Sequence, residues 1–281
     1  MNSPSAYLLV SHGSRDRRPQ IAVEALAQLL RDAWPQPARS TASAHGAIAL
    51  LSPPVTPWIA TAALELAPQP LHEQIQHAAQ QAFAQGYRRL VILPLFLLAG
   101  VHVRVDLPAE VKLAQQALGD AIRYGSASLA AQRSRNGIAS LRNGIDLHLC
   151  PHLGSHAGLE ALLAQTFAEF PQATARILLA HGSRRTPANR QIASLADRLQ
   201  AVPAYWSVAP SLSDRIAERV AAGDREIAIV PYFLFAGGIT DAIAQSVQEL
   251  STQFPDCKLH LAAPLGATRQ LAEIAIDLLT S

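Results

Sequence analysis

The chain has 281 residues, 49% of them hydrophobic and 16% charged, and its formal net charge is +2. This composition predicts a globular protein of one large or two modest domains, and the small net charge argues against binding nucleic acid through a basic surface. Two cysteines are too few for a disulfide framework, a four-cysteine zinc site or an iron–sulfur cluster. The longest apolar run, residues 90–101, is shorter than the roughly 20 residues of a membrane span. We therefore expect a cytoplasmic protein that enters no membrane.

The first predicted strand covers residues 7–10 and runs into a small polar loop, Ser11-His12-Gly13-Ser14. Glycine permits a tight turn there, and a serine with free N–H groups at the start of a helix favours an anion. The loop is followed by a group of arginines, Arg15, Arg17 and Arg18. Arginines beside a helix start suit carboxylates or phosphates, and the alternative is that they are solvated surface residues.

Polar residues also follow the most apolar stretch of the chain, residues 90–101. Such a run is typical of a strand buried on both faces of a parallel sheet, and Pro94 and Gly100 argue against a long helix. His102 and Asp106 come directly after it. Open α/β sheets bind their ligands outside the carboxyl ends of the strands, so this segment predicts a functional site.

The rest of the chain contains segments with a helical pattern and segments with an irregular one. Apolar residues at helical spacing predict helices over residues 20–32, 71–85, 158–170, 189–200 and 212–222. Two segments are predicted to be insertions, 35–59 and 119–144. The first is rich in proline, alanine and serine, and the second repeats the sequence Arg-Asn-Gly-Ile, which predicts turns.

The second half of the chain repeats the first. Residues 177–184, Ile-Leu-Leu-Ala-His-Gly-Ser-Arg, match the first strand and its loop. Residues 227–238 match the apolar stretch that begins at residue 90, and residues 259–266 match residues 147–154. Three matched segments in the same order predict an internal duplication.

Strands and helices alternate within each half, which predicts an α/β fold with parallel sheets. We expect two similar doubly wound, flavodoxin-like domains, residues 1–170 and 171–281. Two such sheets that face each other leave a cleft lined by loops, and we expect the active site there.

The second half lacks most of the polar residues that follow the strands of the first. Ser207, Ile239 and Ile243 stand where the first half has Glu65, His102 and Asp106, and only His181 is retained as the match of His12. Histidines with a carboxylate can bind a borderline divalent metal or move protons near neutral pH. The alternative is that His12 and His181 hydrogen-bond their own turns.

These motifs together resemble the sirohydrochlorin chelatases of the CbiX/SirB type, which are class II chelatases. The resemblance is carried by residues 11–15, by Glu65 ahead of Pro68, and by residues 94–108, with support from residues 180–183 and 231–234. It implies a bilobal protein that inserts Fe²⁺ or Co²⁺ into sirohydrochlorin, a tetrapyrrole with eight carboxylates, without an organic cofactor. We expect a monomer whose partners are this small molecule and the metal ion.

The resemblance also implies roles for individual residues. His12 and His102 are expected to handle the metal, and Glu65 is expected to act with them in catalysis. A second group is expected to hold the carboxylates of the substrate: Ser11, Gly13, Ser14, Arg15, Arg17, His181, Ser183, Arg184 and Arg185.

Two other functions compete with metal insertion. A tetrapyrrole or metal carrier would use the same cleft without turnover. A hydrolase or transferase would use His12 with the serine loop, but the sequence contains no Gly-x-Ser-x-Gly motif to supply a nucleophile. The sequence does not favour iron over cobalt.

Overall fold

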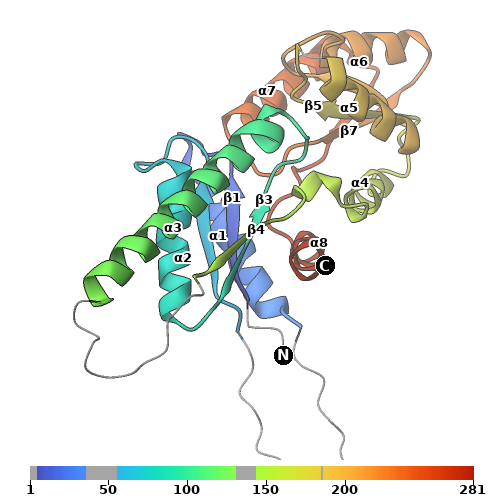
Figure 1. Ribbon diagram of the computed structural model, residues 1–281. Helices are drawn as coiled ribbons and strands as arrows, with labels where there is room; N and C mark the ends of the chain where they lie inside the picture. Colours follow the sequence, from blue (N-terminus) through green and yellow to red (C-terminus); the bar gives the residue numbers. More distant parts are fainter. Residues whose placement is uncertain (1–4, 36–55, 131–143, 185) are drawn as a thin grey trace, which may run out of the picture.

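The computed structural model of the protein describes residues 5–35, 56–130, 144–184 and 186–281. Figure 1 shows two α/β lobes joined along their sides, with the N-terminal half in blue and green and most of the C-terminal half in orange and red. Each lobe contains one parallel sheet of four strands, so the predicted α/β class and the two similar parallel-sheet domains are confirmed.

The first lobe has the strand order β2-β1-β3-β4. Its strands are β1 (Ser5–Ser11), β2 (Ile59–Ala63), β3 (Arg89–Pro94) and β4 (Asp146–Leu149). The helical segments of this half are α1 (Arg17–Ala33), α2 (Leu71–Ala84), the π-helical segment η1 (His102–Asp106), α3 (Leu107–Ala130), the 3₁₀ turn η2 (Leu153–Ser155) and α4 (Gly158–Ala168). The chain moves from β1 to one neighbour, β2, and then back across to the other, β3, so the order of the sheet reverses between β1 and β3.

The second lobe repeats this topology with the order β6-β5-β7-β8. Its strands are β5 (Ala175–Ala180), β6 (Val202–Tyr205), β7 (Glu226–Pro231) and β8 (Lys258–Leu261). Its helices are α5 (Thr186–Arg198), α6 (Leu212–Ala221), α7 (Gly238–Gln253) and α8 (Arg269–Thr280). The duplication predicted from the three matched segments is therefore present in the fold.

Both faces of each sheet are buried, as the continuous apolar strands predict. In β1 every residue from Ala6 to Val10 is buried, and alternate side chains enter different cores. Leu8 and Val10 pack with α2 and α3, whereas Tyr7 and Leu9 join a core that also contains residues of the second lobe. The outer face of the second sheet packs with α6 and α7 in the same way. The inner faces of the two sheets thus share one hydrophobic core, which holds the lobes together.

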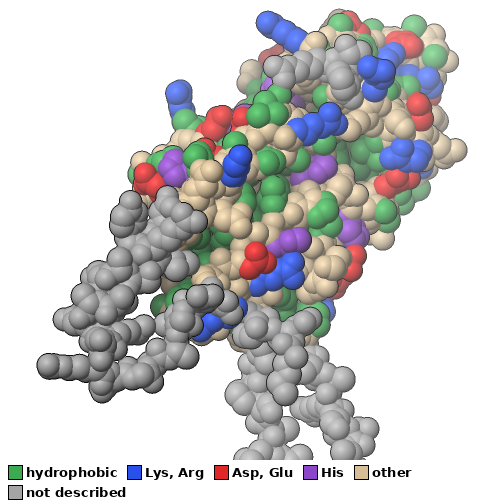
Figure 2. Space-filling view, viewed as in Figure 1, with side chains coloured by type: hydrophobic (Ala, Val, Ile, Leu, Met, Phe, Trp, Pro, Cys, Tyr) green, Lys and Arg blue, Asp and Glu red, His purple; other side chains and the backbone are tan. Residues whose placement is uncertain are grey.

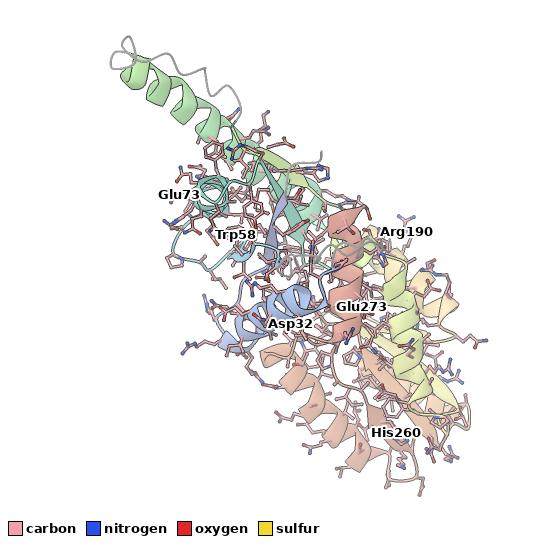
Figure 3. All side chains as sticks on the ribbon, turned by 90° about the horizontal axis from the view of Figure 1, so that it is seen from below. Asp32, Trp58, Glu73, Arg190, His260 and Glu273 are labelled. Carbon is pink, nitrogen blue, oxygen red and sulfur yellow. The ribbon has the colours of Figure 1, made fainter. Side chains whose placement is uncertain are left out.

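The last helix of each half lies against the other half. α4 follows the first sheet in sequence but contacts β7, while α8 follows the second sheet but contacts α1 and β3. Figure 3 shows α8, marked by Glu273, beside α1, marked by Asp32. This exchange adds apolar contacts between the lobes, and the phenol of Tyr232 adds a hydrogen bond of 3.2 Å to the carbonyl of Leu97. Burial raises the pKa of Tyr232 to about 12, so its hydroxyl remains a donor at neutral pH.

The two predicted insertions stay predictions, because most of their residues lie outside the described ranges. Helix α3 continues to Ala130, so the segment 119–144 begins as helix. The repeated Arg-Asn-Gly-Ile turns lie largely outside the described residues, as do residues 36–55 of the first insertion, and Ile59 at its end belongs to β2. The predicted helices at 20–32, 71–85, 158–170, 189–200 and 212–222 are confirmed as α1, α2, α4, α5 and α6. Among the described residues, no helix combines the length and apolar character needed to cross a bilayer.

Candidate metal site

Three of the predicted site residues come together at the carboxyl ends of the first sheet. His12 follows β1, Glu65 follows β2 and His102 begins η1 after β3. One ligand atom from each of these side chains lies within 4.8 Å of the other two. Within the described parts of the chain, this is the one group of three histidine, cysteine or acidic side chains close enough to share a metal ion. The group lies at the reversal of strand order between β1 and β3, where doubly wound sheets bind ligands.

The backbone brings His12 and Glu65 together through a close contact of two loops. The amide of Glu65 donates to the carbonyl of His12 at 2.9 Å, and the amide of Leu64 donates to the carbonyl of Ser11 at the same distance. Gly13 has a φ of +97°, and a Cβ there would lie 1.9 Å from the carbonyl oxygen of Glu65. Any side chain at residue 13 would therefore push Glu65 away from His12, which explains the glycine after the histidine.

Both histidines have their Nδ1 atom engaged on the protein side. Nδ1 of His12 lies 3.4 Å from the carbonyl oxygen of Gly13, and Nδ1 of His102 lies 2.7 Å from a carboxylate oxygen of Asp106. Both partners accept hydrogen bonds and cannot donate them, so these contacts favour the tautomer with the proton on Nδ1 and the lone pair on Nε2. The two rings meet edge to face, with centroids 4.8 Å apart. Two imidazoles and one carboxylate would leave further coordination positions of a metal ion free. Such a ligand set suits a borderline divalent metal such as Fe²⁺, Co²⁺ or Zn²⁺.

The site is open to solvent and is flanked by apolar side chains. The His102 side chain is 36% exposed, and Leu66, which follows Glu65, is 60% exposed. Val101 and Val105 are exposed on either side of His102. Figure 2 shows histidine, basic and hydrophobic side chains together on one face of the molecule. Exposed apolar side chains beside histidines and a carboxylate suit a ligand with a flat apolar body and charged edges.

The second lobe keeps the loops of this site without its ligand set. The amide of Ser207 donates to the carbonyl of His181 at 2.9 Å, just as Glu65 does to His12, and the positive φ of Gly182 matches that of Gly13. Nδ1 of His181 lies 3.0 Å from the carbonyl oxygen of Gly182. Ile239, at the start of α7, occupies the place of His102 and is exposed. His181 therefore has neither a second imidazole nor a carboxylate at the matching positions.

The serines predicted to hold carboxylates make hydrogen bonds within the protein. The hydroxyl of Ser11 donates to the carbonyl of Ala62 at 3.4 Å, and that of Ser14 accepts from the amide of Asp16 at 3.1 Å. The backbone amide of Ser183 donates to the side chain of Asn189 at 2.9 Å. These bonds shape the two loops.

The predicted arginines differ in what they contact. Arg15, Arg17 and Arg184 are exposed, and none of the three has an ion pair among the described residues, whereas Arg185 lies outside those residues. The three described guanidinium groups are therefore available for an anionic ligand.

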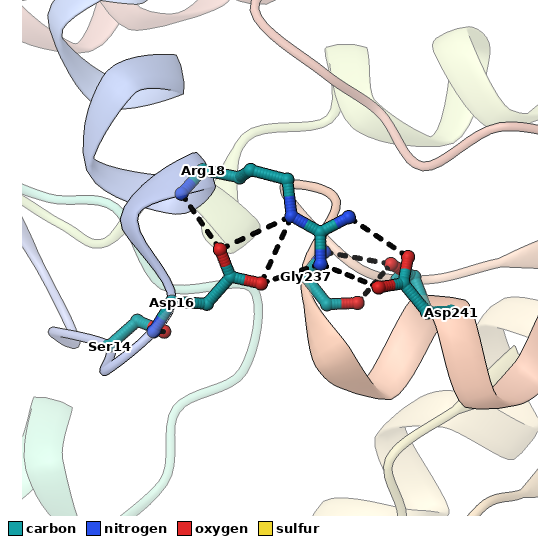
Figure 4. Close-up of polar contacts among 6 residues, drawn as sticks. Ser14, Asp16, Arg18, Gly237 and Asp241 are labelled. Carbon is teal, nitrogen blue, oxygen red and sulfur yellow. Dashed lines mark hydrogen bonds and ion pairs between the residues drawn. The ribbon is translucent and has the colours of Figure 1, made fainter.

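Arg18, in the same cluster of the sequence, is already paired, as Figure 4 shows. Its guanidinium donates to Asp16 at 2.6 Å and to both carboxylate oxygens of Asp241 at 2.6 and 3.0 Å. Arg18 lies in the first turn of α1 and Asp241 in the first turn of α7, so this ion pair joins the helix after the His12 loop to the second lobe. The Arg18 guanidinium holds the pKa values of Asp16 and Asp241 below their usual range. Sequence patterns do not predict this pairing, because Arg18 and Asp241 are far apart in the chain.

Two surface cavities and the buried cysteines lie away from the His12, Glu65 and His102 group. One cavity, of about 320 Å³, is lined by residues of α4 and α8 that include His156 and Asp277. The other, of about 310 Å³, is lined by residues 173–176 and by Gln200, Val202 and Arg219. Burial raises the pKa of Cys150 to about 11, which keeps its thiol protonated and unreactive. The cleft predicted between the lobes stays a prediction.

The fold and the site together define a class: duplicated, bilobal α/β proteins with an open histidine–carboxylate site at the strand ends of one lobe. A family model described as CbiX matches this chain twice, over residues 6–170 and 175–281. The chain belongs to the CbiX family. The resemblance to chelatases of the CbiX/SirB type is thereby confirmed for the whole chain and for both halves. No curated protein matches its sequence.

Solved structures of this kind share the fold at low sequence identity. SirB from Bacillus subtilis with Fe³⁺ is similar with a TM-score of 0.66 and 19% identity, and the match covers 99% of this chain and 94% of that one. The sirohydrochlorin chelatase SirB from Bacillus subtilis subspecies spizizenii in complex with cobalt gives a TM-score of 0.62 over the same shares of both chains, also at 19% identity. CbiX, described as the terminal enzyme for biosynthesis of siroheme in denitrifying bacteria, gives 0.55 at 22% identity and 98% coverage of both chains.

Proposed function

We propose that this protein inserts a divalent metal, Fe²⁺ or Co²⁺, into sirohydrochlorin with release of two protons. The metal ion is a substrate here, and no organic cofactor takes part. The observation that carries the proposal is the approach of ligand atoms of His12, Glu65 and His102 to within 4.8 Å of one another. Because one chain holds both lobes, we propose that it acts as a monomer.

The chemistry of the three side chains fits the reaction. Insertion requires a hydrated cation to lose water while two pyrrole nitrogens lose protons. The unprotonated Nε2 atoms of His12 and His102 can hold the cation at an open site, which lets the metal leave for the macrocycle. As the metal leaves, the same nitrogens can accept the pyrrole protons. The carboxylate of Glu65 offsets the charge of the cation and passes protons to solvent.

The surroundings of the site support a flat ligand with several carboxylates. We propose that the carboxylates are held by the arginines and by the two loops, through Ser11, Gly13, Ser14, Arg15, Arg17, His181, Ser183, Arg184 and Arg185. The exposed apolar side chains of Leu66, Val101 and Val105 in the first lobe, and of Trp206 and Ile239 in the second, are suited to the faces of the ring. Binding energy from the periphery can be used to bend the macrocycle toward the metal.

The related structures support the class of metal. The two SirB structures are described with cobalt and with Fe³⁺, which agrees with a histidine–carboxylate site for borderline metals. We propose that either Fe²⁺ or Co²⁺ is the metal substrate.

The experiment that tests the proposal is anaerobic metal insertion. Sirohydrochlorin is mixed with Fe²⁺, Co²⁺ or Ni²⁺, and the change in its visible absorption is followed with and without protein. We expect the protein to accelerate insertion of Fe²⁺ or Co²⁺ above the spontaneous rate, and the His102→Ala variant to lose that acceleration. Binding of metal and tetrapyrrole without acceleration would instead identify a carrier.

A further inference from the structure

Asp106 contacts His102 but does not belong to the group of metal-binding side chains. Its carboxylate lies 2.7 Å from Nδ1 of His102, and both side chains are partly exposed, 40% and 36%. A carboxylate only accepts hydrogen bonds, so this contact places the proton of the neutral imidazole on Nδ1. The lone pair is then on Nε2, the nitrogen left for a metal. A carboxylate behind a metal-binding histidine typically fixes the ring and its tautomer in this way.

The local backbone holds the two residues at this distance. His102 and Asp106 are the first and last residues of η1, in which the amide of Leu107 donates to the carbonyl of His102, five residues back. The next residue, Leu107, is fully buried and anchors the start of α3 in the core of the first lobe. Asp106 is therefore held on a rigid element rather than on a free loop, and His102 is oriented by it.

The second lobe shows that neither residue is needed for the fold. Ile239 stands in place of His102 at the start of α7, which is a regular α-helix without a π-helical turn. Ile243, which the sequence aligns with Asp106, is 1% exposed and packs in the core as Leu107 does in the first lobe. The second lobe thus folds without an imidazole at this helix start and without the π-helical turn that carries Asp106.

We infer that Asp106 is a positioning residue for His102. It keeps the imidazole in the tautomer with an unprotonated Nε2 and holds the ring so that this nitrogen faces His12 and Glu65. This inference rests on the proposed metal site, but it concerns the readiness of the site before any tetrapyrrole binds.

Three variants test the inference without turnover. Asp106→Ala removes the acceptor, and Asp106→Asn keeps an oxygen that can accept from Nδ1–H but removes the charge. Asp277→Ala is the matched control, because Asp277 lies 2.7 Å from a nitrogen of His156 and is far from the site in the chain. Each protein, free of metal, is labelled with ¹⁵N-histidine to read the His102 tautomer by NMR, and Co²⁺ binding is measured by calorimetry.

We expect Asp106→Ala to raise the Kd for Co²⁺ by about 10–100-fold, the usual cost of losing such a partner. The same variant should show a substantial share of His102 protonated on Nε2. Asp106→Asn should keep the wild-type tautomer and most of the affinity, and Asp277→Ala should bind Co²⁺ as the wild type does.

Either of two results would overturn the inference. The first is a wild-type tautomer and Kd in Asp106→Ala. The second is an equal loss of affinity in Asp106→Asn and Asp106→Ala, which would assign the effect to charge and not to positioning. The proposed function fails in a different way, through normal Co²⁺ binding without accelerated insertion, so the two failures are distinguishable.

Discussion

The two lobes share one scaffold but differ in three side chains at the ends of their strands. In both, a histidine follows the first strand, a glycine with positive φ follows the histidine, and an amide from the next strand's loop donates to the histidine carbonyl at 2.9 Å. The first lobe adds Glu65, His102 and Asp106 to this frame. The sequence alignment gives the second lobe Ser207, Ile239 and Ile243 instead, and Ile243 is buried in the core. The packing of parallel strands therefore dictates the loops, while a few replaceable side chains decide whether a loop can bind a metal.

Removing His102, which the second lobe lacks, should have the largest effect on the rate of metal insertion. We expect His102→Ala to lower the enzymatic rate of metal insertion by about 100-fold or more, because the site loses both a metal ligand and a proton acceptor. The fold should be intact, since Ile239 occupies the same place in the second lobe. His156→Ala, which removes an imidazole that is also hydrogen-bonded to a carboxylate but lies outside the site, is the matched control and should retain most of the rate. Insertion is followed by visible absorption, and near-wild-type turnover by a folded His102→Ala protein would contradict the assignment.

Restoring the missing ligands should bring a metal site back to the second lobe. Ser207→Glu with Ile239→His places a carboxylate and an imidazole beside His181, on side chains that are exposed or partly exposed. We expect a second Co²⁺ to bind, about 10–100-fold more weakly than the first, because Ile243 cannot orient the new histidine. Calorimetry gives the number of sites and their Kd values. A variant that still binds one Co²⁺ would show that the loops of the two lobes are less alike than their backbone hydrogen bonds indicate.

Replacing an arginine should have a similar effect on substrate binding in either lobe, because carboxylates surround the whole macrocycle. Replacing a histidine should have very different effects in the two lobes. A desolvated arginine–carboxylate pair contributes about 1.5–3 kcal/mol. Arg15→Ala and Arg184→Ala should therefore each raise the KM for sirohydrochlorin about tenfold. Lysine should restore only part of the affinity, since it lacks the planar fork.

A porphyrin with two carboxylates is the control substrate for these arginine variants. Its KM should change less than that of the octacarboxylate, because fewer pairs are lost. If neither variant changes the KM of either tetrapyrrole, the arginines are solvated surface residues and do not bind the substrate.

The smallest effect is expected from the ion pair that joins the lobes. Arg18→Ala should slightly lower the free energy of unfolding at neutral pH. Arg18 lowers the pKa values of Asp16 and Asp241 in the folded protein below 3.8, so this stabilisation is present above that pH and is lost as the pH falls through the lowered values.

The test of this ion pair is denaturant unfolding at several pH values. The difference in the free energy of unfolding between wild type and Arg18→Ala should be constant near neutral pH and should disappear in strong acid. Arg269→Ala, which removes a pair within the single helix α8, is the control for losing an exposed arginine. A gap that persists at pH 2 would show that Arg18 acts through something other than its two carboxylates.

Much of the fold could be predicted because it depends on local patterns. Apolar runs such as residues 90–93 predict strands buried on both faces, and the repeated His-Gly-Ser loops identify the duplication. The helix exchange of α4 and α8 could not be predicted, since an amphipathic helix does not encode which sheet it will cover. Nor did the sequence indicate η1, since Pro94 and Gly100 argued only against a long helix in this stretch.

The approach of Glu65 to His12 was the least predictable part of the candidate site. Residues 36–55 lie between the two in the chain, and only the β1–β2 pairing brings their loops into contact. The resemblance to chelatases supplied this residue, whereas spacing alone did not. Similarly, the sequence placed Asp106 near His102 but could not show that their side chains meet at 2.7 Å. Side-chain contacts of this kind depend on backbone geometry that composition and periodicity do not specify.

The central claim is that the metal site belongs to the first lobe alone, and counting bound Co²⁺ tests it most directly. Isothermal titration under anaerobic conditions is carried out on the wild type, on His12→Ala and on His181→Ala, which change the matched histidines of the two lobes. We predict one Co²⁺ per chain in the wild type, one with nearly unchanged Kd in His181→Ala, and none in His12→Ala. Two Co²⁺ ions per wild-type chain, or equal losses of binding in the two variants, would contradict the account.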